Sequence, residues 1–294
     1  MAPERPPSAA PGPAAAPRLV LRGLRVAYSS GRGWTEALRG VSLAVGREKV
    51  GIVGESGSGK STLGRAVMRL LPPRARLEAE AMRFEEVDLL RASERTMRDL
   101  RGARMAMVLQ DPKHALNPLR TVEAQITEAL RLHGVASRAE RRERAHAMLE
   151  AVRIRDPRRV LGLYPHEVSG GMGQRVMIAM MLAGSPRLVI ADEPTSALDV
   201  TVRGQILDIL QERVEAEGAS LLFISHDLTL VGDFCDRVLV MYGGRVLEEV
   251  AAADLRRASH PYTRALLGSV PPLDRKVDRL AVPERDPRWL EAAP

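Results

Sequence analysis

The fold of this chain is decided by the stretch Gly54-Glu55-Ser56-Gly57-Ser58-Gly59-Lys60-Ser61. An apolar run, Val50-Gly51-Ile52-Val53, precedes it, and a segment of helical character follows at residues 62–70. This order of strand, glycine-rich turn and helix is the context in which the pattern G-x-x-x-x-G-K-[ST] forms a phosphate-binding loop. The alternative is a glycine-rich surface turn with an incidental lysine, and the flanking strand and helix argue against it.

The residue types of this stretch suit a polyphosphate. Glycines let the backbone approach closely, so that successive N–H groups and the N-terminus of the next helix converge on anionic oxygens. Lys60 supplies a positive charge at the β- and γ-phosphates, and the Ser61 hydroxyl is placed to ligate Mg²⁺. The stretch therefore predicts nucleotide binding, and we call residues 54–61 the phosphate loop.

Composition narrows the class of protein. The 294 residues carry a net charge of +7, which is compatible with nucleic acid or an anionic membrane surface, but the charge is almost entirely arginine and is scattered along the chain. An arginine-rich composition explains it equally well. Cys235 is the only cysteine, so no disulfide forms within the chain and a reducing compartment is expected.

The sequence predicts a cytoplasmic protein without a membrane span. Its longest apolar run, residues 176–184, is about half of the roughly 18 residues that a span needs. Residues 1–17 are rich in proline and alanine and too broken by proline for a signal peptide. They are predicted to be a disordered leader.

The remaining pattern is typical of an α/β domain. Residues 18–29 alternate like a strand, and a second strand is expected at residues 37–45. Residues 105–109 form a buried-strand pattern that ends at Gln110-Asp111-Pro112. From about residue 121 to 160 apolar residues recur at helical spacing, which predicts a helical insertion.

Two carboxylates follow another buried strand. The run Leu188-Val189-Ile190-Ala191 ends in Asp192-Glu193. Ligands bind at the carboxyl ends of strands in open α/β sheets, so Asp192 is placed to hold Mg²⁺ through water and Glu193 to orient and deprotonate an attacking water. The alternative is a strand that merely ends in an acidic turn.

Three weaker signals accompany these motifs. Ser169-Gly170-Gly171 precedes a helical, methionine-rich segment and is typical of an anion-binding helix N-terminus, although alone it fits a simple helix cap. Residues 196–199 fit a capping box. His226 follows the apolar strand 220–225, at the sheet edge expected for Gln110, which favours a contact with phosphate or water.

Together these motifs resemble an ABC transporter ATPase subunit over about residues 18 to 270. The resemblance implies a P-loop NTPase of the ABC ATPase fold, with a RecA-like core, an antiparallel β subdomain and a helical subdomain. It implies an ATPase domain at 18–250 with the helical subdomain inserted at about 116–168, and a C-terminal extension at 251–294. In chain order the motifs resemble the Walker A, Q-loop, signature, Walker B, D-loop and H-loop, at residues 54–61, Gln110, 169–174, Asp192-Glu193, 196–199 and His226.

A narrower resemblance is to the group that imports oligopeptides, dipeptides and nickel. It is carried by Gln110-Asp111-Pro112 with Leu116-Asn117-Pro118, by Tyr164-Pro165-His166-Glu167, by Ser-Gly-Gly-Met at 169–172, and by residues 260–267. Peptide import is the first expectation and import of nickel or a metal chelator is the alternative. A soluble ABC ATPase acting on nucleic acid or ribosomes has only the basic pI in its favour.

The resemblance also assigns roles to residues. ATP and Mg²⁺ are the implied cofactors, with Glu193, His226 and Gln110 catalytic. Two ATPase subunits, copies or paralogues, would stack head to tail, so that the signature acts on the partner's ATP. Tyr28 is expected to stack on adenine, with Trp34 as a competitor. The ATP contacts are Gly54, Glu55, Ser56, Gly57, Ser58, Gly59, Lys60, Ser61, Thr62, Tyr28, Ser169, Gly170, Gly171 and Asp199, and the Mg²⁺ ligands are Ser61, Gln110 and Asp192.

The implied partners are the second ATPase subunit, two transmembrane permease subunits and, indirectly, a substrate-binding protein, with no specific nucleic acid. The chain would then lie on the cytoplasmic face of the cell membrane as a peripheral subunit.

Two features depart from the family pattern. Gly173 in the signature is expected to weaken the start of its helix, and the tail after Pro271 lacks the cysteines of longer family tails.

Overall fold

A six-stranded sheet forms the centre of the protein. The computed structural model describes residues 16–31, 33–196, 198–269 and 286–290. Five strands of the sheet are parallel, and β11 pairs antiparallel with β10 at one edge. The sheet order is β11 (Arg245–Ala251), β10 (Arg237–Tyr242), β3 (Lys49–Val53), β9 (Ser220–Ile224), β8 (Leu188–Asp192) and β7 (Met105–Val108).

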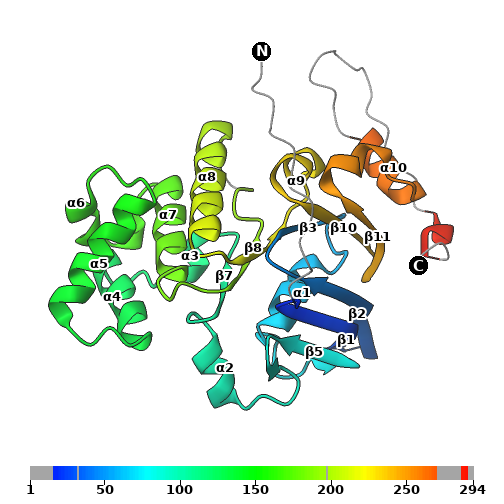
Figure 1. Ribbon diagram of the computed structural model, residues 1–294, viewed down its shortest axis with the longest axis horizontal. Coiled ribbons are helices and arrows are strands. Elements are labelled where there is room, and N and C mark those ends of the chain that lie inside the picture. The colour runs from blue at the N-terminus through cyan, green and yellow to red at the C-terminus, as the bar shows by residue number, and fades with distance from the viewer. Residues whose placement is uncertain (1–15, 32, 197, 270–285, 291–294) are drawn as a thin grey trace.

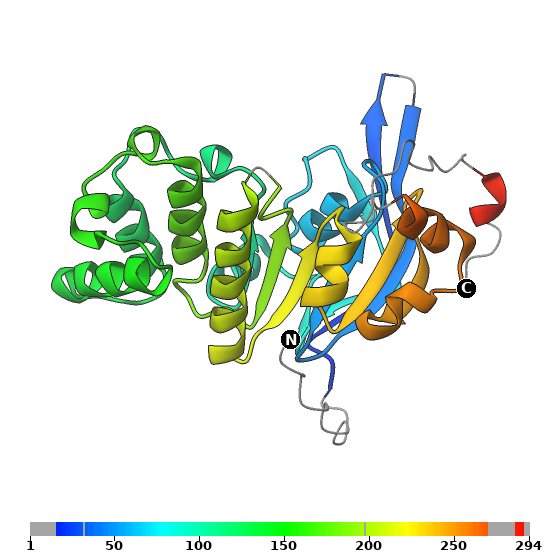
Figure 2. The same cartoon turned by 90° about the horizontal axis from the view of Figure 1, so that it is seen from above.

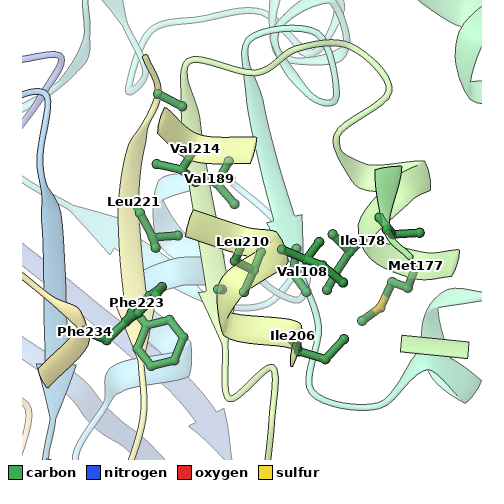
Figure 3. Packing of buried hydrophobic residues seen from close by; sticks show 14 of the residues in the cluster. Val108, Met177, Ile178, Val189, Ile206, Leu210, Val214, Leu221, Phe223 and Phe234 are labelled. Carbon is green, nitrogen blue, oxygen red and sulfur yellow. The ribbon is translucent and has the colours of Figure 1, made fainter. Parts of the chain in front are cut away.

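Both faces of the central sheet are covered, which is why its strands are continuous apolar runs. Along β9, Leu221 and Phe223 belong to one buried cluster, and Leu222 and Ile224 belong to the other, as expected from the two-residue period of a strand. The first cluster packs under α7 (Gly170–Met181), α8 (Val200–Ala216) and α9 (Leu228–Phe234) (Figure 3).

A second, antiparallel sheet lies against the other face. Its order is β2-β1-β5-β6, with β4 pairing to β1. The helix α1 (Lys60–Val67) contributes Leu63, Ala66 and Val67 to the cluster shared by the two sheets. The strands are β1 (Leu19–Ser30), β2 (Gly33–Val45), β4 (Arg76–Glu78), β5 (Ala81–Phe84) and β6 (Val87–Asp88), and α2 (Glu94–Leu100) follows them.

The second strand is longer than the sequence predicts. It was expected from residue 37, but β2 begins at Gly33, because Trp34 and Glu36 continue the pairing with β1. Residues 33–36 are all exposed, so they do not alternate between apolar and polar as a half-buried strand does. The apolar alternation that predicts a strand therefore does not reach them.

Helices gather at one end of the molecule, and the C-terminal elements lie at the other (Figures 1 and 2). Side chains at the N-termini of these helices accept backbone hydrogen bonds, as Thr121, Ser137, Asp156 and Ser169 do. The helices at the first end are α3 (Pro112–Ala115), α4 (Val122–Leu132), α5 (Arg138–Ala151), α6 (Pro157–Leu161), the 3₁₀ turn η1 (Pro165–Glu167) and α7. Those at the other are η2 (Ala252–Arg257), α10 (Pro261–Gly268) and η3 (Pro287–Leu290).

The two helix caps that the sequence suggested have different outcomes. Ser169 caps the methionine-rich helix, as the Ser-Gly-Gly turn indicated, and this helix begins at Gly170. The helix after the Walker B strand is capped by Asp199, whose side chain accepts from Val202 N, and not by Ser196 as a capping box would have it. Ser196 bonds back to the Glu193 carbonyl instead.

Residues 1–15 of the predicted leader and most of the tail after Pro271 lie outside the described residues. Within the part of the chain that the structure describes, no helix combines the length and apolarity needed to cross a bilayer.

Candidate nucleotide site

The phosphate loop joins β3 to α1 and is held by close backbone contacts. A side chain at Gly54, which has φ +150°, would place its Cβ 2.1 Å from the Met241 carbonyl oxygen. At Gly59, with φ +104°, the Cβ would lie 2.7 Å from the Ala37 carbonyl oxygen. Glycine is therefore required at both ends of the loop by space as well as by backbone conformation.

Lys60 is folded into this loop. Its Nζ donates to the carbonyl oxygens of Gly54 at 2.7 Å and Glu55 at 2.8 Å, and the residue is almost fully buried. Burial lowers the pKa of the ammonium, while Glu193, Asp192 and Glu55 act in the opposite direction. A buried cation at the start of a helix and inside a glycine-rich turn is placed to bind an anionic polyphosphate.

Ser61 and Asp192 meet beside Lys60 although 131 residues separate them. The Ser61 hydroxyl donates to Asp192 Oδ1 at 2.9 Å. Burial raises the pKa of Asp192, and the hydrogen bond from Ser61 opposes that shift. A hydroxyl and a buried carboxylate are oxygen ligands of the kind that Mg²⁺ takes when phosphate and water complete its shell. The described residues contain no group of three or more His, Cys, Asp or Glu that would hold a metal ion by themselves.

Glu193 lies at the meeting point of three strand ends. Gln110, after β7, donates from Nε2 to Glu193 Oε2 at 3.4 Å and to Ser196 Oγ at 3.2 Å. His226, after β9, places Nδ1 3.4 Å from Glu193 Oε2. The backbone of Glu193 has φ +48°, an uncommon conformation for a residue with a side chain, and its N–H donates to the Ile224 carbonyl.

The two aromatic candidates for adenine differ in their surroundings. Tyr28 is half-buried, and its hydroxyl donates to the side chain of Thr62 at 3.4 Å, which places it beside the start of α1. Trp34 is exposed, and the guanidinium of Arg76 covers its ring at 3.7 Å from the ring centre.

The signature residues lie on a different surface. Ser169 caps α7, and Ser169 and Gly171 line a pocket together with Arg153, Arg159 and Arg175. The residues that line this pocket belong to the segment 153–175 and to α8, and none of them belongs to the phosphate loop. Within one chain the signature and the loop are therefore not parts of one pocket.

Gly173 lies inside the signature helix, and its expected weakening of the start of that helix stays a prediction. Its N–H donates to the Ser169 carbonyl at 2.8 Å, and α7 continues through it. A Cβ there would lie 3.5 Å from Pro112, an ordinary contact.

One contact of the phosphate loop was missed from the sequence. The Glu55 N–H donates to the hydroxyl of Tyr262 in α10. In the sequence, residues 260–267 stand out only by their resemblance to a family motif. Nothing in that pattern predicts that they lie beside the phosphate loop.

Comparison with known proteins agrees with this geometry. A family model described as ABC transporter matches residues 38–196. A probable peptide ABC transporter ATP-binding protein of Sinorhizobium fredii is 50% identical over 256 residues, which cover 86% of this chain and 76% of that protein. The dipeptide transport ATP-binding protein of Escherichia coli is 48% identical over 235 residues, covering 80% of this chain and 72% of that protein.

Solved structures agree as well. A dimeric ATP-binding cassette in a post-hydrolysis state, bound to ADP and Pi, superposes with a TM-score of 0.69 at 28% identity, covering 80% of this chain and 98% of that one. A protein from Clostridium perfringens that is part of an ABC transporter complex gives a TM-score of 0.67 at 27% identity, covering 83% of this chain and 92% of that one. These matches confirm the expected fold. The chain belongs to the family of ATP-binding subunits of ABC transporters.

Proposed function

We propose that this chain binds and hydrolyses ATP to energise the import of peptides, with dipeptides or oligopeptides as cargo. The observation that carries the proposal is the convergence of Lys60, Ser61, Asp192 and Glu193 at the carboxyl ends of β3 and β8. The relatives from S. fredii and E. coli, named as peptide and dipeptide transport proteins, support the cargo class.

In this proposal ATP lies on the phosphate loop, with Tyr28 against the adenine. The Lys60 ammonium and backbone N–H groups of residues 54–62, except that of Glu55, which donates to Tyr262, hold the phosphates. Ser61, Asp192 and Gln110 would hold Mg²⁺, which when bound would supply positive charge beside the phosphates.

Hydrolysis then depends on Glu193. Its carboxylate orients a water for in-line attack and accepts a proton from it. Gln110 fixes the direction of that carboxylate through the 3.4 Å contact, and His226, beside the same oxygen, contacts the γ-phosphate.

A complete site requires a second ATPase subunit, either a copy or a paralogue. Because the signature pocket is separate from the phosphate loop, Ser169, Gly170 and Gly171 would act on ATP held by the partner, in a head-to-tail dimer. Asp199 would contact the same interface. The dimeric state of the matched cassette supports this arrangement.

Coupling to two permease subunits would occur on the helical side, at the cytoplasmic face of the membrane, with a substrate-binding protein delivering cargo. The inserted helical subdomain, about residues 116–168, offers three exposed apolar side chains, Leu119, Leu132 and Tyr164, and we place the docking surface at Leu119 and Tyr164. The hydrogen bond from Val122 N to the Leu163 carbonyl joins the turns that carry them. Exposed apolar groups of this kind are typical of a surface that a partner covers.

The direct test of the hydrolytic role is Glu193→Gln. The variant is expected to keep ATP affinity while turnover falls on the order of a hundredfold or more, because an amide cannot accept the proton. ATP should then hold the subunit as a dimer, seen as an earlier peak in gel filtration. Glu215→Gln, at an exposed position of α8, is the matched control. Normal turnover in Glu193→Gln would remove Glu193 as the base.

A further inference from the structure

A tyrosine from the C-terminal part of the chain contacts the phosphate loop directly. The hydroxyl of Tyr262, in α10, accepts a hydrogen bond from the backbone N–H of Glu55 at 3.1 Å, across 207 residues of sequence. Tyr262 is completely buried. Its ring therefore presents the hydroxyl to the loop from the side opposite to solvent.

The contact falls on the peptide group that also binds Lys60. The carbonyl of the Gly54–Glu55 peptide belongs to Gly54 and accepts from Lys60 Nζ at 2.7 Å, while the N–H of the same peptide donates to Tyr262. Because a peptide group is planar and rigid, fixing its N–H also fixes the direction of its carbonyl. Tyr262 thus controls the acceptor that holds the Lys60 ammonium in the loop.

An aromatic cluster holds Tyr262 in place. Its ring lies 4.7 Å from that of Tyr242 at the end of β10 and 5.1 Å from that of Trp289 in η3, and Tyr242 and Trp289 are themselves 5.4 Å apart. Trp289 is also buried. Tilted and edge-on ring pairs at these distances attract one another in addition to burying apolar area.

The start of α10 is anchored independently. Glu248 of β11 accepts from the backbone N–H of Ser259 at 2.7 Å and of His260 at 3.2 Å, and His260 Nδ1 accepts from Tyr262 N at 3.1 Å. The turn after β10 adds a second tie to the loop, because Gly244 N donates to the Ser58 carbonyl at 3.1 Å. The C-terminal elements therefore form a support behind the phosphate loop.

We propose that Tyr262 is a positioning residue for nucleotide binding, through which the C-terminal elements hold the Gly54–Glu55 peptide and Lys60 ready for the phosphates. The inference rests on the proposed function. A loop that is ordered before binding loses less conformational freedom when the nucleotide arrives, so its affinity is higher. Without the hydroxyl, ATP must order this peptide itself.

The test is Tyr262→Phe in the full-length chain, which removes the hydroxyl and keeps the ring. We expect binding of the fluorescent nucleotide mant-ATP to weaken about three- to tenfold, as for the loss of one uncharged hydrogen bond. The KM for ATP should rise in parallel, while kcat at saturating ATP stays within about twofold, because bound ATP restores the loop. Tyr242→Phe, which changes a ring of the same cluster without removing the Glu55 contact, is the matched control and should bind like wild type.

A second pair of variants tests the cluster. Trp289→Ala should weaken mant-ATP binding because it frees the Tyr262 ring, and Trp289→Phe should restore most of the affinity. Wild-type affinity in Tyr262→Phe would overturn the inference, as would a fall in kcat with unchanged KM. If the wild-type chain itself bound no mant-ATP, the proposed function would fall first and this inference with it.

Discussion

Lys60 is the residue on which nucleotide affinity should depend most. Its ammonium is buried and bonded to two carbonyls of the loop, so it is already placed for the phosphates. Lys60→Ala is expected to weaken ATP binding on the order of a hundredfold, because charge-assisted hydrogen bonds to phosphate are lost. Equilibrium titration with mant-ATP measures this, with Lys113→Ala at an exposed position as the control. Unchanged affinity would contradict the assignment of the phosphate loop.

Asp192 should show a conflict between stability and activity. Its pKa is raised above the ordinary 3.8 by burial, so the folded chain binds the proton more tightly than the unfolded chain, and the ionised form destabilises the fold at neutral pH. Asp192→Asn is therefore expected to raise the melting temperature of the nucleotide-free chain at pH 7. The gain should shrink as the pH falls through the raised pKa of the folded chain, and it should vanish below 3.8, where Asp192 is neutral in both states.

The same variant should lose hydrolysis on the order of a hundredfold, because a neutral amide is a poor ligand for Mg²⁺. Melting curves at several pH values and an assay of phosphate release measure the two effects. Ser61→Ala is the companion variant, since it removes the hydroxyl on the other side of the proposed Mg²⁺ site. A lower melting temperature in Asp192→Asn at pH 7 would show that the buried charge is compensated in the folded state.

At the scale of single elements, the residue that caps α8 is expected to affect both the stability of the fold and the proposed dimer. Asp199 caps this helix through Val202 N, and it is also proposed to contact the partner subunit. Asp199→Ala should cost about 1 kcal/mol, as for loss of an N-cap, and lower the melting temperature by about 2–4 °C. Asp199→Ser restores a capping oxygen and should restore the melting temperature. If Asp199 also acts across the dimer, ATP hydrolysis should stay low in Asp199→Ser, and full recovery of hydrolysis would limit its role to the cap.

The starts of helices show what an element's own sequence can reveal. Ser169, Thr121 and Ser137 each cap the helix that follows, and their residue type is the usual signal for such a start. For α7 that signal holds although three glycines, which are poor helix formers, follow it. Gly173 and Gln174 are buried in the interior, so the first turns of this helix are packed against the rest of the protein.

At the scale of the whole molecule, a substitution at Leu119 tests whether ATP hydrolysis is coupled to uptake through the helical side. Its side chain is 85% exposed on the helical side of the molecule, where a permease subunit is proposed to dock. Leu119→Asp should leave ATP hydrolysis by the isolated subunit unchanged and reduce dipeptide uptake several-fold in the assembled importer, because a charge replaces an apolar contact. Leu70→Asp, at an exposed apolar position outside the helical subdomain, is the matched control. Full uptake by Leu119→Asp would place the docking surface elsewhere.

The family, the fold class and the residue types of the candidate site can all be predicted from the amino-acid sequence alone. This was possible because the phosphate loop, the Asp192-Glu193 pair and the Ser-Gly-Gly turn are each contiguous, and each stands next to a strand or helix with a clear apolar period. Three of the predicted side chains, Lys60, Asp192 and Glu193, lie at the same edge of the sheet.

The contacts among the side chains of the site depend instead on how distant segments pack in the folded chain. The order of strands in the sheet places β3 between β10 and β9, which brings the Tyr262 hydroxyl to Glu55 and the Ser61 hydroxyl to Asp192. No local pattern specifies such contacts, because their geometry depends on packing between segments 131 and 207 residues apart.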